Sequence, residues 1–588
     1  MFCNCTTFTK VVALGIFLFA ILSIYRFFKS NPSLPPGPKG LPFIGNALDM
    51  PTQKEWLKFA QWGEIFGDIC SVTVLGQPLI ILNSAQAAID MLDKKSAIYS
   101  DRPVLQMGGE LVGWKNTLVL LPYGDRFRRY RRLFYRLIGT HASVKRFHPS
   151  SELEARAFLR RLVVSPEQLA NHVRYTAGAN ILRISHGYEV QPHCDPFVNI
   201  ADEATEQFSL ATAPGGFLVD LIPALRHLPC WFPGAGFQLT ARNWSSTLQE
   251  MVDAPFNFVK EQMAAGTACV SFCSTLLESK VLNAEEEFDL KWCAASLYSG
   301  MVASCATIKE WTWTIASVPA NDSVKTVSAL YSFFLGIALH SDVLAKAQEE
   351  IDRVVGKERL PTFADRPHLP YINALVLEVL RWHTVTPTAV PHRAMQDDIH
   401  DGFFIPKGAL VIPNVWKITH DPLIYSHPFE FNPARFLETD KKQPERDPRD
   451  FCFGFGRRSV EINLCQTFQA NTSCIPGLAQ ARRFPWCFLR YTLTTSPLGS
   501  RLADSSIYIT CATVLAVFDI KKAIENGTVV EPVHDYTQGT IRWVIHPSIT
   551  YPITVSTIEF SHPKPFRCSI LPRSQKALSL ILSQPETS

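Results

Sequence analysis

The sequence lacks the features that mark several large classes of protein. Its 57 lysines and arginines nearly balance 53 aspartates and glutamates, and no long basic run occurs, so nothing favours a nucleic-acid-binding surface. Its 15 cysteines include no Cys-x-x-Cys pair, which argues against a zinc site or a disulfide framework and favours buried, reduced thiols. It also has no internal repeat and no fingerprint for binding a flavin or nicotinamide cofactor. With 47% hydrophobic residues, the chain is instead typical of a folded globular protein.

The N-terminus contains an apolar run from Val11 to Tyr25, with Lys10 before it and Arg26 and Lys29 after it. This run is shorter than the roughly 20 residues of a usual membrane-spanning helix. However, Arg26 can snorkel towards the surface, and no small-residue cleavage site follows. We therefore expect an uncleaved transmembrane anchor over residues 1–30, with a cleaved signal peptide as the alternative. The positive charges after the run favour a cytosolic body.

A proline-rich stretch over residues 31–46 predicts a stiff hinge between this anchor and the rest of the chain. Residues 47–588 are expected to form one mixed domain, mainly α with small β-sheets (α+β). Apolar residues at helical spacing predict helices over three segments: Asp125–Arg136, Asp342–Val355 and His368–Trp382. Gly76–Leu82 is strand-like, and Phe403–Ile412 resembles a hairpin with its turn at Lys407–Gly408.

Glu378 and Arg381 are three residues apart in the last predicted helix, so their side chains share one face and can pair. Such a pair is usually a solvated surface feature. Here the flanking residues are apolar, which predicts a buried pair that needs further hydrogen bonds. Arg435, in the sequence Phe431-Asn-Pro-Ala-Arg435-Phe436, is an additional arginine that could complete a triad.

The segment Phe451–Arg458 alternates phenylalanine with glycine and ends in two arginines. Glycine allows a tight turn with close backbone approach, and arginine offers a bidentate fork to a carboxylate, so this segment suits an anionic ligand. An ordinary glycine-rich turn is the alternative. Cys452 precedes the arginines and is expected to face the core.

In this order and spacing, these elements resemble the signature of the cytochrome P-450 family. Six residues match its motifs, namely Glu378, Arg381, Arg435, Phe453, Gly456 and Arg458. The helix around Phe127–Arg131 and the sequence Pro391-His-Arg393 match as well. The resemblance implies the cytochrome P-450 fold behind the membrane anchor, with haem b as cofactor. It also implies that Arg131, Arg393 and Arg458 neutralise the haem propionates, and that a cysteine thiolate ligates the iron.

The sequence departs from the family pattern in three places. The family's axial cysteine falls at Val460, and the likeness is lost over residues 459–498, where Cys465 and Cys474 are the candidate iron ligands. The alternative is that both cysteines are accidental matches. Residues 301–324 interrupt the expected distal helix, and residues 542–560 form a third break. We interpret all three as insertions derived from retained introns.

The interrupted distal helix bears on catalysis, because the family's acid–alcohol pair has no in-register counterpart in this chain. Thr326, where the helix resumes, is the candidate catalytic residue. The resemblance implies a monooxygenase that inserts one oxygen atom from O2 into a lipophilic small molecule, in fungal secondary metabolism or xenobiotic oxidation. It further implies electrons from NADPH–cytochrome P-450 reductase, and a single-pass protein of the endoplasmic reticulum membrane with its catalytic domain in the cytosol.

Two alternatives remain open at this point. One is a catalytically inactive or mis-spliced family member that lacks the axial thiolate. The other is a non-enzymatic, membrane-anchored scaffold without a cofactor.

Overall fold

The computed structural model describes residues 33–51, 53–191, 195–212, 216–279, 281–302, 325–440, 442–458, 498–536, 561 and 563–582. The predicted anchor over residues 1–30 lies outside these ranges. So do all but residues 301, 302 and 498 of the three predicted insertions.

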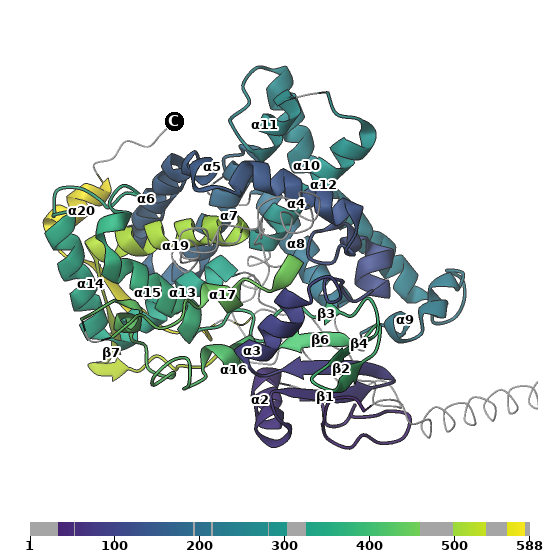
Figure 1. Ribbon diagram of the computed structural model, residues 1–588. Helices are drawn as coiled ribbons and strands as arrows, with labels where there is room; N and C mark the ends of the chain where they lie inside the picture. Colours follow the sequence, from purple (N-terminus) through teal and green to yellow (C-terminus); the bar gives the residue numbers. More distant parts are fainter. Residues whose placement is uncertain are drawn as a thin grey trace, which may run out of the picture.

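Helices make up most of the described chain (Figure 1). The α-helices are α2 (Glu55–Phe66), α3 (Ala85–Ala88), α4 (Asp125–Ile138), α5 (His141–Lys145), α6 (His148–Val164), α7 (Leu169–His186), α8 (Pro196–Ala211), α9 (Leu218–Leu221), α10 (Gly236–Ala264), α11 (Phe272–Ser279), α12 (Ala284–Val302), α13 (Lys325–Leu339), α14 (Ser341–Val354), α15 (Pro370–Trp382), α16 (Val415–Thr419), α17 (Arg449–Cys452), α19 (Leu498–Val517) and α20 (Gln575–Leu582). Short 3-10 and π-helical turns include η1 (Ile89–Lys94), η2 (Gln106–Val112), η7 (Pro433–Phe436) and η8 (Gly456–Arg458).

The strands form small sheets. They are β1 (Ile69–Val74), β2 (Gln77–Leu82), β3 (His392–Arg393), β4 (Asp398–His400), β5 (Phe403–Ile405), β6 (Leu410–Pro413), β7 (Phe518–Glu525), β8 (Thr528–Val530) and β9 (Cys568–Pro572). The largest described sheet has the order β1-β2-β6-β3, in which β2 and β6 run parallel and the other pairs antiparallel. A mainly helical chain with small sheets is the predicted fold class, which is confirmed.

The predicted hairpin over Phe403–Ile412 is wrong. β5 pairs with β4, whereas β6 pairs with β2 and β3 in a different sheet. The turn at Lys407–Gly408 therefore connects two sheets, and the Gly408 N–H donates to the Ala394 carbonyl. The apolar strand β2 provides a long-range partner for β6 that a local pattern does not reveal.

The three predicted helices are confirmed as α4, α14 and α15, with ends that differ by at most two residues. α15 begins at Pro370, whose missing N–H costs nothing in the first turn. The next two amides, of Tyr371 and Ile372, donate to the buried carboxylate of Glu350 in α14. α15 is therefore capped by a neighbouring helix, and ten of its 13 residues are buried.

The core has two large parts. In one, α6, α7, α13 and α19 pack together, with α14, α15 and β7 beside them (Figure 1). In the other, α4, α7, α8, α10 and α12 pack around aromatic side chains. A smaller cluster lies between α2 and the sheet of β1 and β2. The motif of α15 and the apolar residues of the Phe451–Arg458 segment thus belong to the first core.

No helix in the described ranges is, by itself, long and apolar enough to cross a membrane. The pair α13 and α14 passes that test together, although the two helices are bent by 106° relative to each other.

Candidate functional site

Glu378 and Arg381 lie one turn apart in α15, and both are fully buried. Arg381 Nε donates to Glu378 Oε2 over 2.7 Å and Arg381 Nη2 donates to Oε1 over 2.8 Å, which makes a bidentate pair. The other Arg381 donors reach the backbone carbonyl oxygens of Thr419, Pro428 and Glu430. The buried charges therefore have the extra hydrogen bonds that such a pair requires.

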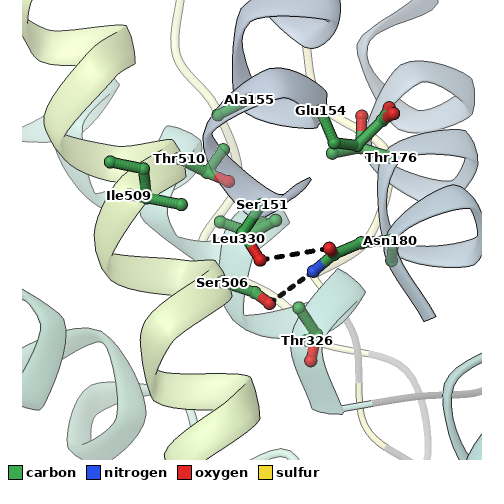
Figure 2. A pocket seen from close by; sticks show the side chains of 11 residues that line it. Ser151, Glu154, Ala155, Thr176, Asn180, Thr326, Leu330, Ser506, Ile509 and Thr510 are labelled. Carbon is green, nitrogen blue, oxygen red and sulfur yellow. Dashed lines mark hydrogen bonds between the residues drawn. The ribbon is translucent and has the colours of Figure 1, made fainter. Parts of the chain in front are cut away.

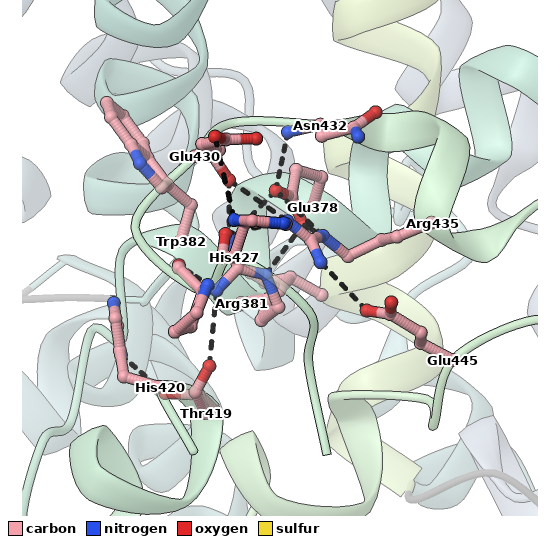
Figure 3. A network of polar contacts seen from close by, with 12 residues as sticks. Glu378, Arg381, Trp382, Thr419, His420, His427, Glu430, Asn432, Arg435 and Glu445 are labelled. Atoms are coloured by element: carbon pink, nitrogen blue, oxygen red, sulfur yellow. Dashed lines mark hydrogen bonds and ion pairs between the residues drawn. The ribbon is translucent and has the colours of Figure 1, made fainter. Parts of the chain in front are cut away.

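Arg435, in η7, joins this network (Figure 3). Its Nε lies 3.1 Å from Glu378 Oε2, and its Nη1 donates to Glu445 Oε2 over 2.8 Å. Although burial would raise the pKa of Glu445, hydrogen bonds that include those from Lys442 and Arg435 hold this pKa at about 2. The network ties α15 to the irregular chain that leads from α16 to the glycine-rich segment.

The glycine-rich segment turns sharply between α17 and η8. Gly454 and Gly456 have φ values of 92° and 58°, which favour glycine. A Cβ at Gly456 would stand 2.1 Å from the Leu92 carbonyl oxygen, so no larger residue fits there. Phe453 is buried, and Cys452 faces the core as predicted, with its Sγ 3.5 Å from the Leu380 oxygen. We refer to residues Phe453–Arg458 as the glycine-rich loop.

Arg458 ends this loop and is buried. Its guanidinium donates to the carbonyl oxygens of Ser100, Leu118 and Leu121, and it lies 4.1 Å above the ring of Phe127 in α4. These contacts place the loop against the chain that connects η1 to α4.

Arg102 is a buried arginine that the sequence reasoning missed. Its Nη1 donates to the carbonyl oxygens of Val390 and Pro391 over 2.7 and 2.8 Å, and its Nε donates to Val119. It comes from an irregular segment between η1 and η2, where no periodic pattern or motif marked it. The structure places it beside Arg458, whose pKa its charge lowers.

The surroundings of three arginines in this region disfavour the charged form of the guanidinium. Burial lowers the pKa of Arg102 to about 9 and that of Arg131 to about 10. The pKa of Arg458 lies well below its ordinary value because of burial and then because of the charge of Arg102. Asp101 is an acidic neighbour of Arg102 and Arg458, and it also lies 3.7 Å from Arg393 Nη1. An anion bound here would favour the charged form of these arginines.

His392 and Arg393 alternate in β3, so they occupy opposite faces of the strand. His392 is buried, and its Nδ1 donates to the backbone carbonyl oxygen of Tyr99 over 2.7 Å. Burial, followed by the charge of Arg102, lowers the pKa of His392 far below its ordinary value. Arg393 is instead half-exposed, with 37% of its side chain accessible. The strand alternation is a sequence signal that could have indicated His392. We refer to Arg102, Arg131 and Arg458 as the cation cluster, and the uncharged ring of His392 lies beside it.

Thr326 lies in a different environment, at the start of α13, and does not belong to the cation cluster. It is buried and lines a cavity of about 10 Å³ between α6, α7, α13 and α19 (Figure 2). In this cavity Ser151 Oγ donates to Asn180 Oδ1 over 3.1 Å, and Asn180 Nδ2 donates to Ser506 Oγ over 2.8 Å. The volume is about that of one water molecule.

The candidate iron ligands Cys465 and Cys474, and Val460 at the expected position, lie outside the described residues. Within the described part of the chain, no three histidine, cysteine or acidic side chains gather as a metal site. A haem iron needs only one protein thiolate, so this finding bears on multi-ligand metal sites alone. The described cysteines include five that are buried, as predicted, and two that are exposed: Cys70, Cys273, Cys293, Cys452 and Cys511, against Cys230 and Cys269.

Comparison with known proteins gives a consistent result. The family model described as cytochrome P-450 matches residues 35–459. Cytochrome P-450 monooxygenase 208 of Postia placenta is 46% identical over 554 residues, which cover 94% of this chain and 93% of the relative. Cytochrome P-450 monooxygenase claR of Ampulloclitocybe clavipes is 42% identical over 98% of this chain and 93% of its own length. Cytochrome P-450 monooxygenase ppsD of Aspergillus oryzae is 36% identical over 93% of this chain and 90% of its own length.

Proposed function

This chain belongs to the cytochrome P-450 family, and from that premise we propose that it inserts one oxygen atom from O2 into a lipophilic small molecule of fungal secondary metabolism. The observation that carries the proposal is identity over nearly the whole chain to relatives that are named monooxygenases. Its cofactor is haem, as in the family. No comparable observation supports the two alternatives, which are a catalytically inactive family member and a non-enzymatic scaffold.

The cation cluster fits the anionic side of a haem. Haem b carries two propionates, and a region where burial depresses the pKa of three arginines is stabilised by such a dianion. Arginine is suited to bidentate contacts with carboxylates. We therefore propose that Arg102, Arg131 and Arg458, together with His392, hold the propionates. Arg393, whose Nη1 lies 3.7 Å from Asp101, stays a candidate propionate contact at the edge of this region.

When bound, a thiolate-ligated haem activates oxygen, because the thiolate donates electron density that favours cleavage of the O–O bond. The protein orients the cofactor, excludes water and moves protons. In this proposal Phe453 and Gly456 shape the loop that precedes the thiolate. The Glu378–Arg381–Arg435 network holds α15 against the irregular chain that leads to this loop. We propose that the Thr326 hydroxyl carries a proton in this reaction, and the cavity beside it, with room for about one water molecule, supports this proposal.

The thiolate itself is proposed to come from Cys465 or Cys474, which are the cysteines that follow Arg458 before α19 begins. This assignment depends on the status of residues 459–498. The family match ends at residue 459, where the likeness is expected to stop. We propose that residues 301–324, 459–498 and 542–560 are insertions in an otherwise continuous domain over residues 47–588. Spliced transcripts that retain all three segments would overturn the retained-intron explanation.

An electron-donating partner is implied by the family, and we propose that it is a membrane-bound NADPH–cytochrome P-450 reductase. The exposed side of α4 supports this proposal, since Arg132 and Arg136 are exposed there and Arg128 forms a surface ion pair with Asp125. Such a basic face steers an acidic partner towards the protein.

A membrane location is proposed together with this partner. Trp231, Phe232 and Ile222, between α9 and α10, expose 80%, 45% and 52% of their surfaces. Exposed tryptophan and apolar side chains suit the boundary between lipid and water. With the anchor over residues 1–30, they support a single-pass protein of the endoplasmic reticulum whose catalytic domain is cytosolic.

The activity is tested by co-expressing the full chain with a reductase and supplying lipophilic candidate substrates under ¹⁸O2. The expected result is a product that gains one ¹⁸O atom, formed in the membrane fraction and dependent on NADPH. A product labelled from water, or NADPH-independent turnover, would contradict a monooxygenase.

A further inference from the structure

The glycine-rich loop rests on the π-helical turn η1 through direct backbone contact. The Gly456 N–H donates to the Asp93 Oδ1 of η1. A Cβ at Gly456 would collide with the Leu92 oxygen at 2.1 Å and approach the Ser96 Cβ at 2.9 Å. The middle of the loop is therefore in van der Waals contact with η1, and its amide reaches one particular carboxylate.

Asp93 is held in an environment that is unfavourable for a carboxylate unless it accepts hydrogen bonds. Its burial raises its pKa to about 6, and the Gly456 amide acts in the opposite direction. Asp450 raises this pKa further, while Arg446 lowers it. Placing a carboxylate here costs desolvation free energy, which its hydrogen bond to the loop offsets.

The other acidic residue of η1 behaves differently. Asp90 pairs with Lys94 on the same turn and accepts from Gln86, all at the exposed side. Within the described part of the chain, the Asp90 carboxylate pairs with Lys94 and Gln86 and not with the glycine-rich loop, so it offers a control of the same residue type on the same element.

We propose that Asp93 is a positioning residue for the glycine-rich loop, acting through the Gly456 amide. The far end of the loop is fixed separately, by Arg458 on the Ser100, Leu118 and Leu121 oxygens. Asp93 fixes the middle, two residues before Arg458. Together they set the direction in which the chain leaves towards the residues that follow Arg458. The functional consequence rests on the proposed haem site, whereas the contact itself does not.

The contact is tested first by hydrogen–deuterium exchange of the peptide that covers residues 451–458, a measurement independent of haem. In Asp93→Ala the exchange of this peptide should be about tenfold faster, because the Gly456 amide loses its acceptor. Asp93→Asn keeps an acceptor oxygen and should stay within about threefold of the unaltered chain. Asp90→Ala should leave the peptide unchanged. Equal exchange in Asp93→Ala and Asp90→Ala would overturn the proposal.

A peptide from α19 serves as the reference for global stability. If a variant is destabilised as a whole, hydrogen–deuterium exchange rises in this peptide as well. If Asp93→Ala does not accumulate as folded protein, Asp93→Ser replaces it, because serine is too short to reach the amide but remains polar. A uniform increase across both peptides would overturn a local role.

A second experiment tests the effect on the proposed haem site, using the same variants and the absorption spectrum of the reduced, carbon-monoxide-bound protein. Asp93→Ala should shift part of the signal from the thiolate-type band to the band of a haem that has lost its thiolate, and Asp93→Asn should restore it. A spectrum unaffected in Asp93→Ala would overturn the link to the iron ligand. If no variant, nor the unaltered chain, binds haem while the exchange effect persists, the proposed function fails and the positioning contact stands.

Discussion

Glu378 is the residue on which the buried network converges, since both Arg381 and Arg435 donate to its carboxylate. Removing one partner of a buried charge pair leaves the others uncompensated, which typically costs about 3–5 kcal/mol. We predict that Glu378→Ala lowers the free energy of unfolding by about this amount in chemical denaturation. Asp342→Ala, which breaks the exposed Asp342–Lys346 pair at 3.6 Å, should cost less than about 0.5 kcal/mol. Equal effects would show that burial does not govern these pairs.

Glu445 gives a prediction for pH. Against the effect of burial, hydrogen bonds from Lys442, Ser426 and Arg435 hold its pKa at about 2 in the folded protein, below the roughly 4.3 of an unperturbed glutamate. Its contribution to stability is therefore complete above pH of about 4.3 and is lost as the pH falls towards 2. Allowing for solvent screening, Glu445→Gln should cost about 1–2 kcal/mol at pH 6 and almost nothing near pH 2. Glu438→Gln, at an exposed position, is the control and should change stability by less than about 0.5 kcal/mol at pH 6.

Arg102 and Arg393 are a matched pair for the cation cluster, since one is buried beside Arg458 and the other is half-exposed. Loss of a buried charge partner of an anion typically costs at least 2 kcal/mol, so Arg102→Ala should release haem at least about tenfold faster than the unaltered protein. Arg393→Ala should release it at a nearly unchanged rate. Transfer of haem to excess apomyoglobin measures both rates. Faster loss from Arg393→Ala alone would contradict the proposed role of Arg102 and support the contact of Arg393 that the motif implied.

These residues also show what the sequence could predict. Glu378, Arg381 and Arg435 were found because their motif has fixed spacing and apolar neighbours, and the structure brings them together. Arg102 was missed because it lies in irregular chain and reaches Val390 and Pro391 across 288 and 289 residues. No local pattern encodes such a contact.

At the scale of elements, periodicity predicted α4, α14 and α15 well, because each has one or more buried faces of regular spacing. Strand pairing was predicted less well. β5 and β6 were assigned to one hairpin, yet their partners are β4 and β2, and choice of partner depends on tertiary contacts.

The start of α15 provides a test at this scale. Glu350 is buried and accepts from both the Tyr371 and Ile372 amides, so it acts as a cap from α14. Glu350→Ala should destabilise the protein by about 1–2 kcal/mol, as the loss of a helix cap does. Its exposed neighbour Glu349, replaced by alanine, should change stability by less than about 0.5 kcal/mol. Thermal unfolding of the two variants compares them directly, and equal shifts would contradict the capping role.

At the scale of the whole molecule, family membership and a mainly helical fold were predicted from a few motifs in the correct order, and both are shown. The ligand of the iron was not, because the chain departs from the family pattern just beyond Arg458, at Val460. The described residues contribute a buried network behind α15, a loop in contact with η1, and a cation cluster that we propose for the haem propionates.

The measurement that tests this account most directly is the carbon-monoxide difference spectrum of the reduced protein. The full 588-residue chain, with all three proposed insertions, is expressed in membranes for this purpose. The account predicts the band of a thiolate-ligated haem, which disappears when the ligating cysteine, Cys465 or Cys474, is replaced by serine. Protein that accumulates in membranes but shows no such band would contradict it and would identify this chain as a catalytically inactive or mis-spliced member of the family.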